Sequence, residues 1–114
     1  MKFEPAKMET TILPNFKGGN KKLVTKQYED KNVKILMNSV LEPGASIGLH
    51  THQGSLEVIY IISGTGTAIC EGETENLYTG DVHYCPDGAT HTLVNTGRDD
   101  LIFIGIIPQL KKAD

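Results

Sequence analysis

Residues 44 to 64 read GASIGLHTHQGSLEVIYIISG, and this stretch decides how the rest of the chain is interpreted. His50 and His52 are one residue apart, and side chains two positions apart along a strand point to the same face. Glu57 begins a β-branched run, where a hairpin can bring its carboxylate back over the two imidazoles. The stretch therefore predicts three polar side chains that converge within a β-structure.

A third imidazole is expected from His91, which follows the tight turn at residues 86 to 88 and begins another predicted strand. Three imidazoles and one carboxylate suit divalent first-row ions such as Mn, Fe, Co, Ni, Cu or Zn. Four protein ligands also leave positions open on an ion that prefers five or six. The sequence predicts one metal ion per chain, of a kind that the ligands do not distinguish, held by His50, His52, Glu57 and His91.

Short β-rich runs recur outward from this stretch, separated by turns rich in glycine and proline. They are Val33 to Leu41, Leu56 to Ile62, Thr65 to Cys70, Thr74 to Tyr78, Val82 to Cys85, His91 to Val94 and Leu101 to Ile107. Strands of about five residues without any helical period are typical of a sandwich or barrel. A chain of 114 residues has room for one such domain.

The chain divides into three parts by composition. Residues 1–32 contain two prolines, a Gly-Gly pair and a charged tract, which predict an N-terminal arm of short strands and turns. Residues 33–110 carry the barrel, and residues 111–114 form a charged tail.

Two spaced patterns in the chain resemble the motifs of the cupin family. The first consists of Gly44, His50, His52, Glu57 and Gly64. The second consists of Gly80, Pro86, Gly88, His91 and Asn95. So many positions at set spacings are hard to meet by chance.

The resemblance implies an all-β fold, a double-stranded β-helix or jelly-roll β-barrel of two antiparallel sheets, with the metal in its mouth. It implies that His50, His52 and Glu57 supply ligands from the first motif and His91 from the second. Small cupins often dimerise by exchanging an N-terminal strand. We therefore expect a homodimer in which the arm of residues 1–32 is swapped.

Four residues are candidates for binding a small-molecule ligand. Ile59 and Ile61 are in register with Glu57 and are expected to line a fairly apolar cavity. Tyr60 and Tyr84 are candidate donors to a ligand in the lumen, and the alternative for both is an ordinary barrel aromatic.

His83 and Cys85 share one strand face and have two interpretations. They are either a second, softer metal pair or part of the packed, hydrogen-bonded wall. The second interpretation is favoured, because a pair without further ligands is more often structural.

The predicted ligand set supports two functions. The first is a metalloenzyme of dioxygenase, isomerase or lyase type, acting on a carbonyl- or hydroxyl-bearing molecule that chelates the ion. The alternative is a non-catalytic binding or sensing module with a structural metal. Arg98 is the only arginine and lies outside both motifs, which disfavours an oxalate-type decarboxylase and a strongly anionic ligand unless a lysine substitutes.

Composition also bears on partners and location. The net charge is −3 and the lysines cluster near the chain ends, so nucleic-acid binding is not expected. No apolar run reaches the length of a membrane-spanning helix, which argues against a membrane partner. The start of the chain lacks a signal-peptide pattern, which predicts a cytoplasmic protein whose Cys70 and Cys85 are free thiols.

Overall fold

The computed structural model describes residues 1–110, so the predicted charged tail of residues 111–114 lies outside the described residues. Within residues 1–110 the regular secondary structure is almost entirely β-strand, with two short 3-10 turns. The elements are η1 (Pro5–Lys7), β1 (Thr11–Pro14), η2 (Phe16–Gly18), β2 (Lys22–Glu29), β3 (Val33–Leu41), β4 (Ser46–Thr51), β5 (Glu57–Ser63), β6 (Gly66–Cys70), β7 (Glu73–Leu77), β8 (Val82–Cys85), β9 (Thr90–Val94) and β10 (Leu101–Pro108). The all-β prediction is confirmed.

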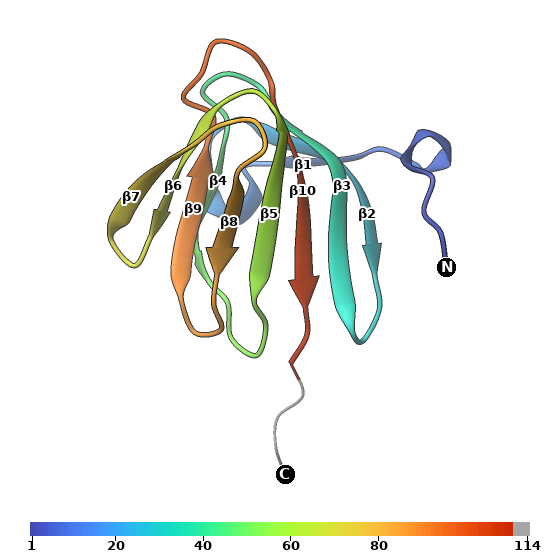
Figure 1. The fold of residues 1–114 in the computed structure, drawn as a ribbon. Coiled ribbons are helices and arrows are strands. Elements are labelled where there is room, and N and C mark those ends of the chain that lie inside the picture. Colours follow the sequence, from blue (N-terminus) through green and yellow to red (C-terminus); the bar gives the residue numbers. More distant parts are fainter. Residues whose placement is uncertain (111–114) are drawn as a thin grey trace.

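The strands form two antiparallel sheets that face each other (Figure 1). One sheet has six strands in the order β1-β2-β3-β10-β5-β8, and the other has four in the order β4-β9-β6-β7. Strands adjacent in sequence lie in different sheets at several points, as between β4 and β5 and between β8 and β9. This topology confirms the double-stranded β-helix.

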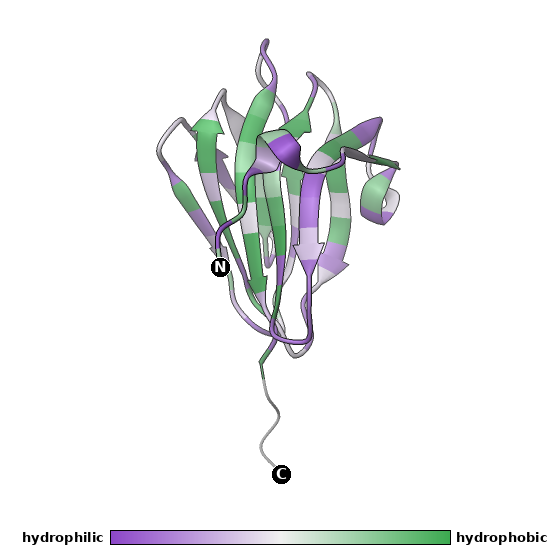
Figure 2. Ribbon diagram, turned by 90° about the vertical axis from the view of Figure 1, so that its right-hand side faces the viewer, coloured by the Kyte–Doolittle hydropathy of each residue, from purple (hydrophilic) through white to green (hydrophobic). Residues whose placement is uncertain are grey.

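The core lies between the two sheets, because the strands alternate buried and exposed residues. Along β5, Glu57, Ile59 and Ile61 point inward and are buried, while Tyr60 is exposed. The alternating hydrophobic and hydrophilic bands along the strands are visible in Figure 2. The buried apolar cluster includes Phe103 together with the two isoleucines. Packed side chains therefore fill the interior beneath Glu57.

The predicted arm packs against its own barrel. β2 pairs with β3, and β1 pairs with β2, so residues 11–29 extend the six-stranded sheet. The segment after η2 is held against β4 by two hydrogen bonds between Asn20 and Ser46: the Asn20 amide donates to Ser46 Oγ at 2.8 Å, and the Ser46 amide donates to the Asn20 carbonyl at 3.0 Å. This contact places Phe16 and Lys17 beside the strand that carries His50. No helix among residues 1–110 is long and apolar enough to cross a membrane.

Candidate metal centre

The structure brings the four predicted ligands together from three strands. His50 lies near the end of β4, His52 follows that strand, Glu57 begins β5 and His91 lies in β9. His50 and His91 are directly opposite each other in the β4–β9 pair. One ligand atom from each of the four residues lies within 4.8 Å of the others. Residues that are up to 41 positions apart in the chain thus form one cluster.

The Nε2 atom of His91 is at the centre of this cluster. It lies 3.0 Å from His52 Nε2, 3.2 Å from His50 Nε2 and 3.0 Å from Glu57 Oε1. His52 Nε2 lies 3.2 Å from the same carboxylate oxygen. All four side chains therefore aim one nitrogen or oxygen at a common point.

The other ring nitrogen of each histidine is already used. His50 Nδ1 donates to the Gly48 carbonyl at 2.7 Å, and His52 Nδ1 pairs with Ser55 Oγ at 3.1 Å. His91 Nδ1 pairs with His83 Nε2 at 3.0 Å. A proton on each Nδ1 leaves the Nε2 lone pair free, which is the tautomer that a metal ligand needs.

This donor set fits a divalent first-row ion. Metal–nitrogen bonds of about 2.0–2.1 Å place neighbouring ligands of a six-coordinate ion about 3 Å apart. The observed separations between Nε2 atoms are 3.0 and 3.2 Å. Three lone pairs and one carboxylate at these separations repel one another unless a cation or proton lies between them. An ion held here would act as a Lewis acid toward a ligand in its open positions.

The surroundings favour a neutral His50 and an ionised Glu57, which are the charge states in which these two side chains bind a metal. Burial lowers the pKa of His50, which favours its neutral form. Burial alone would raise the pKa of Glu57, but hydrogen bonds from the Nε2–H groups that His52 and His91 carry when no metal is bound outweigh this effect and lower the pKa to about 2. A Cβ atom at Gly105 would lie 2.9 Å from Glu57 Oε2, so a glycine there makes room for the carboxylate.

The stability of the metal-free protein is expected to fall as the pH drops from 4.5 to about 2. The pKa of Glu57 is about 2 in the folded state, against an ordinary value of 4.5. Between these values the unfolded chain binds a proton that the folded chain does not, so stability is lost on acidification. The buried carboxylate contributes about 3 kcal/mol of this dependence.

Guanidinium unfolding of metal-stripped protein at pH 5 and pH 3 measures this dependence. The Glu57→Gln variant is the control, because its side chain does not titrate. An equal loss of stability in the variant and the wild type would contradict the assignment of this pH dependence to Glu57.

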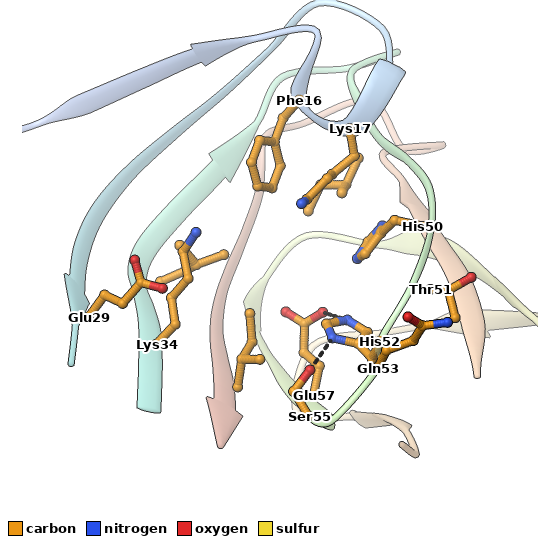
Figure 3. A pocket seen from close by; sticks show the side chains of 13 residues that line it. Phe16, Lys17, Glu29, Lys34, His50, Thr51, His52, Gln53, Ser55 and Glu57 are labelled. Carbon is orange, nitrogen blue, oxygen red and sulfur yellow. Dashed lines mark hydrogen bonds and ion pairs between the residues drawn. The ribbon is translucent and has the colours of Figure 1, made fainter. Parts of the chain in front are cut away.

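A pocket of about 310 Å³ opens beside the cluster (Figure 3). His50, His52 and Glu57 lie on one side, and Phe16 and Lys17 reach over them from the η2 segment. The lining also includes two charged residues, Lys34 and Glu29, and three apolar ones, Leu36, Ile47 and Ile107. The pocket thus contains the open side of the candidate metal centre.

The structure does not bring the four predicted ligand-binding residues to this pocket. Tyr60 and Tyr84 lie on the outer face of the six-stranded sheet and are 45% and 55% exposed. Ile59 and Ile61 face inward but are fully buried in the packed core. The expectation for the two tyrosines is corrected, because alternate residues of β5 and β8 face outward. The expectation for the two isoleucines is corrected, because the interior beside them is packed rather than hollow.

His83 and Cys85 belong to the wall of the barrel, as favoured. His83 bonds to His91 and to Glu75, and within residues 1–110 the metal-ligand cluster contains neither His83 nor Cys85. Cys70 and Cys85 are free thiols. Burial raises the pKa of Cys85 to about 12, which keeps this thiol protonated and unreactive.

Several residues of the site escape prediction from the sequence. Phe16 and Lys17 belong to the arm, and Lys34 lies on β3, far from both motifs. Ser55, which pairs with His52, stands between two predicted ligands, and its place in the HTHQGS run is the one local signal available. Glu29, Leu36 and Ile107 reach the pocket only through strand pairing.

Comparisons with known proteins agree with this site. The cupin-domain family matches residues 37–107. The oxalate-binding protein of Thermotoga maritima is 32% identical over 100 residues, which are 83% of this chain and 83% of that protein. The oxalate decarboxylase of Bacillus subtilis is 34% identical over 79 residues, which are 65% of this chain but only 20% of that protein.

A solved structure extends the likeness to the arm. A crystal structure from Thermotoga maritima, described as a predicted oxalate decarboxylase, has a TM-score of 0.86 and 28% identity. The superposition covers 96% of this chain and 100% of that one. Because the family match spans more than half of the residues and includes all four converging side chains, the chain belongs to the cupin family.

Proposed function

We propose that this protein binds one divalent first-row metal ion and, through the open positions of that ion, a small chelating carboxylate. One observation carries the proposal: the four donor atoms lie beside a pocket that is also lined by two lysines, Lys17 and Lys34. Such a pocket combines a Lewis acid with two ammonium groups. It suits an anion that is small enough to fit about 310 Å³.

The two lysines are available to a ligand. Lys17 Nζ and Lys34 Nζ lie 5.5 and 5.8 Å from the centre of the Phe16 ring, which gathers both ammonium groups around one aromatic side chain. Within residues 1–110 neither forms an ion pair. They take the place of the arginine that is missing from both motifs, which removes the argument against an anionic ligand.

The relatives suggest the ligand class. One similar protein is named for binding oxalate and another for decarboxylating it. Oxalate is a small dicarboxylate that chelates a metal with one oxygen from each carboxylate. We therefore propose oxalate or a similarly small carboxylate as the ligand.

A metalloenzyme acting on such a ligand is the second candidate, and Glu29 favours it. Apart from Glu57, Glu29 is the only acid among the residues that line the pocket within the described chain. A carboxylate that is not a metal ligand can take up or release a proton during a reaction. Metal-dependent consumption of the ligand would support the enzyme, and binding without consumption would support the binding module.

Calorimetric titration of oxalate into manganese-loaded protein tests the proposal. We expect binding that is lost when the metal is removed. Replacing Lys17 and Lys34 with alanine is expected to weaken oxalate binding by about fivefold each and about 20-fold together, since each exposed charge-assisted contact contributes about 1 kcal/mol. Manganese affinity should change much less, because neither lysine belongs to the ligand set.

The control for these variants is Lys22→Ala, which removes the same charge from an exposed position outside the pocket. We expect it to leave oxalate binding unchanged. Oxalate binding that is equal in the metal-free protein, or absent from the loaded wild type, would overturn the proposal.

We further propose a homodimer that forms through the outer face of the six-stranded sheet. β10, β5 and β8 are neighbours in that sheet and expose a patch of large apolar side chains. Its members are Tyr60, Ile62, Val82, Tyr84 and Ile106. A contiguous apolar patch of this kind marks an interaction surface, and a second copy can cover it by two-fold symmetry.

We also propose a cytoplasmic location, which the free thiols Cys70 and Cys85 support.

The double variant Val82→Lys/Tyr84→Lys is expected to convert this dimer to a monomer, because it places charges within the buried face. Light scattering after size-exclusion chromatography measures the mass. Ile12→Lys is the matched control, since Ile12 is an exposed apolar residue on β1 in the arm. A mass that falls only in the Ile12 variant would point to exchange of the arm instead.

A further inference from the structure

His91 differs from the other two histidine ligands in what supports it. The Nδ1 atoms of His50 and His52 pair with an uncharged carbonyl and an uncharged hydroxyl. His91 Nδ1 pairs with the Nε2 atom of His83, and the Nδ1 atom of His83 pairs with the Glu75 carboxylate. Of the three histidines in the cluster, His91 alone has an Nδ1 atom that pairs with another ionisable side chain, His83, which in turn pairs with Glu75.

The chain of contacts runs from the core to the surface. The side chain of His83 is 1% exposed, whereas that of Glu75 is 51% exposed. The ring planes of His83 and His91 are inclined by only 14°, with the bonded nitrogens 3.0 Å apart. Glu75 lies on β7 and His83 on β8, which are the end strands of the two sheets. The contact therefore also bridges the open side of the barrel.

The hydrogen bonds allow one arrangement of protons when His91 offers Nε2 to a metal. His91 Nδ1 must then carry the proton and donate it to His83 Nε2. His83 accepts on Nε2, so as a neutral ring it carries its proton on Nδ1 and donates to the Glu75 carboxylate. The negative charge of Glu75 stabilises this arrangement from the far end.

We propose that His83 and Glu75 are positioning residues that hold His91 in the tautomer and orientation required for metal binding. The proposal rests on the metal site of the proposed function, and it does not depend on the carboxylate ligand. A purely structural bridge between β7 and β8 would affect folding stability. A positioning role affects metal affinity and the electronic environment of the ion as well.

Cobalt(II) titration of the full chain, followed by visible absorption, tests the proposal. His83→Leu removes both contacts and is expected to weaken cobalt binding by about 10- to 100-fold and to alter the absorption bands. His83→Gln is expected to recover most of the affinity, because its amide can accept from His91 and donate to Glu75.

The charge of Glu75 is tested separately. Glu75→Gln keeps an acceptor but loses the charge, so we expect a few-fold weaker cobalt binding. Glu73→Gln makes the same change at an exposed position on the same strand and should bind cobalt as the wild type does.

The proposal would be overturned by a folded His83→Leu variant that has a lowered melting temperature but keeps the wild-type cobalt affinity and spectrum. Such a result would leave only a structural bridge. If His83→Leu does not fold, a Glu75→Gln variant that binds cobalt as tightly as the wild type has the same meaning. A wild type that binds no cobalt would overturn the metal site itself, whereas failure to bind oxalate would leave this proposal intact.

Discussion

Replacing His91 with alanine is expected to abolish stable metal binding. Its Nε2 atom is 3.0–3.2 Å from a donor atom of each of the other three residues, so its loss removes the ligand at the centre of the cluster. We expect a decrease in affinity of more than about 1,000-fold, or about 4 kcal/mol. Elemental analysis should find a single ion per chain in the wild type and almost none in the variant.

Thermal unfolding provides a second measurement of the same effect. A metal that binds only the folded state stabilises it by about 2.7 kcal/mol at 100 times its dissociation constant. The wild type should therefore melt at a higher temperature when metal is added, and the His91→Ala variant should not. Leu49→Ala is the control, because Leu49 lies beside His50 on β4 but is 66% exposed. A His91→Ala variant that retains one ion per chain would contradict the assignment.

Replacing Gly48 with alanine is expected to destabilise the fold by about 3 kcal/mol. A Cβ atom at this position would lie 2.1 Å from the Lys17 carbonyl oxygen and 2.7 Å from the Gly19 amide nitrogen. Both are backbone atoms, so the η2 segment would have to move away from β4. For a domain of this size the melting temperature should fall by about 12 °C.

The same substitution is expected to weaken carboxylate binding more than metal binding. Displacing η2 moves Phe16 and Lys17 away from the pocket, whereas the candidate metal ligands lie on or directly after β4, on β5 and on β9. Gly72→Ala is the control: Gly72 has a φ of +78° and no heavy atom within 4 Å of its added Cβ, so only backbone strain applies. Equal destabilisation by the two substitutions would show that the close approach at Gly48 is unimportant.

The candidate metal ligands and most strands are predictable from the sequence because both depend on local patterns. Runs of β-favouring residues bounded by turns predicted Val33–Leu41 and Val82–Cys85 with their observed bounds. The spacing of His50, His52 and Glu57 places three ligands around a single turn, and the second motif adds His91. These inferences need only the geometry of a strand and the chemistry of imidazole and carboxylate.

The tertiary structure alone decided which face of each strand lies inside and what surrounds the candidate metal centre. Periodicity separates the two faces of a strand without saying which one is buried, and Tyr60 and Tyr84 prove to lie outside. Lys17 and Lys34 share the pocket because η2 packs on β4 while β3 lies across the barrel, and the contact of Glu75 with His83 joins the ends of two sheets. Such neighbours are set by long-range pairing, which leaves no regular spacing in the sequence, whereas the candidate ligands His50, His52 and Glu57 are brought together largely by local spacing.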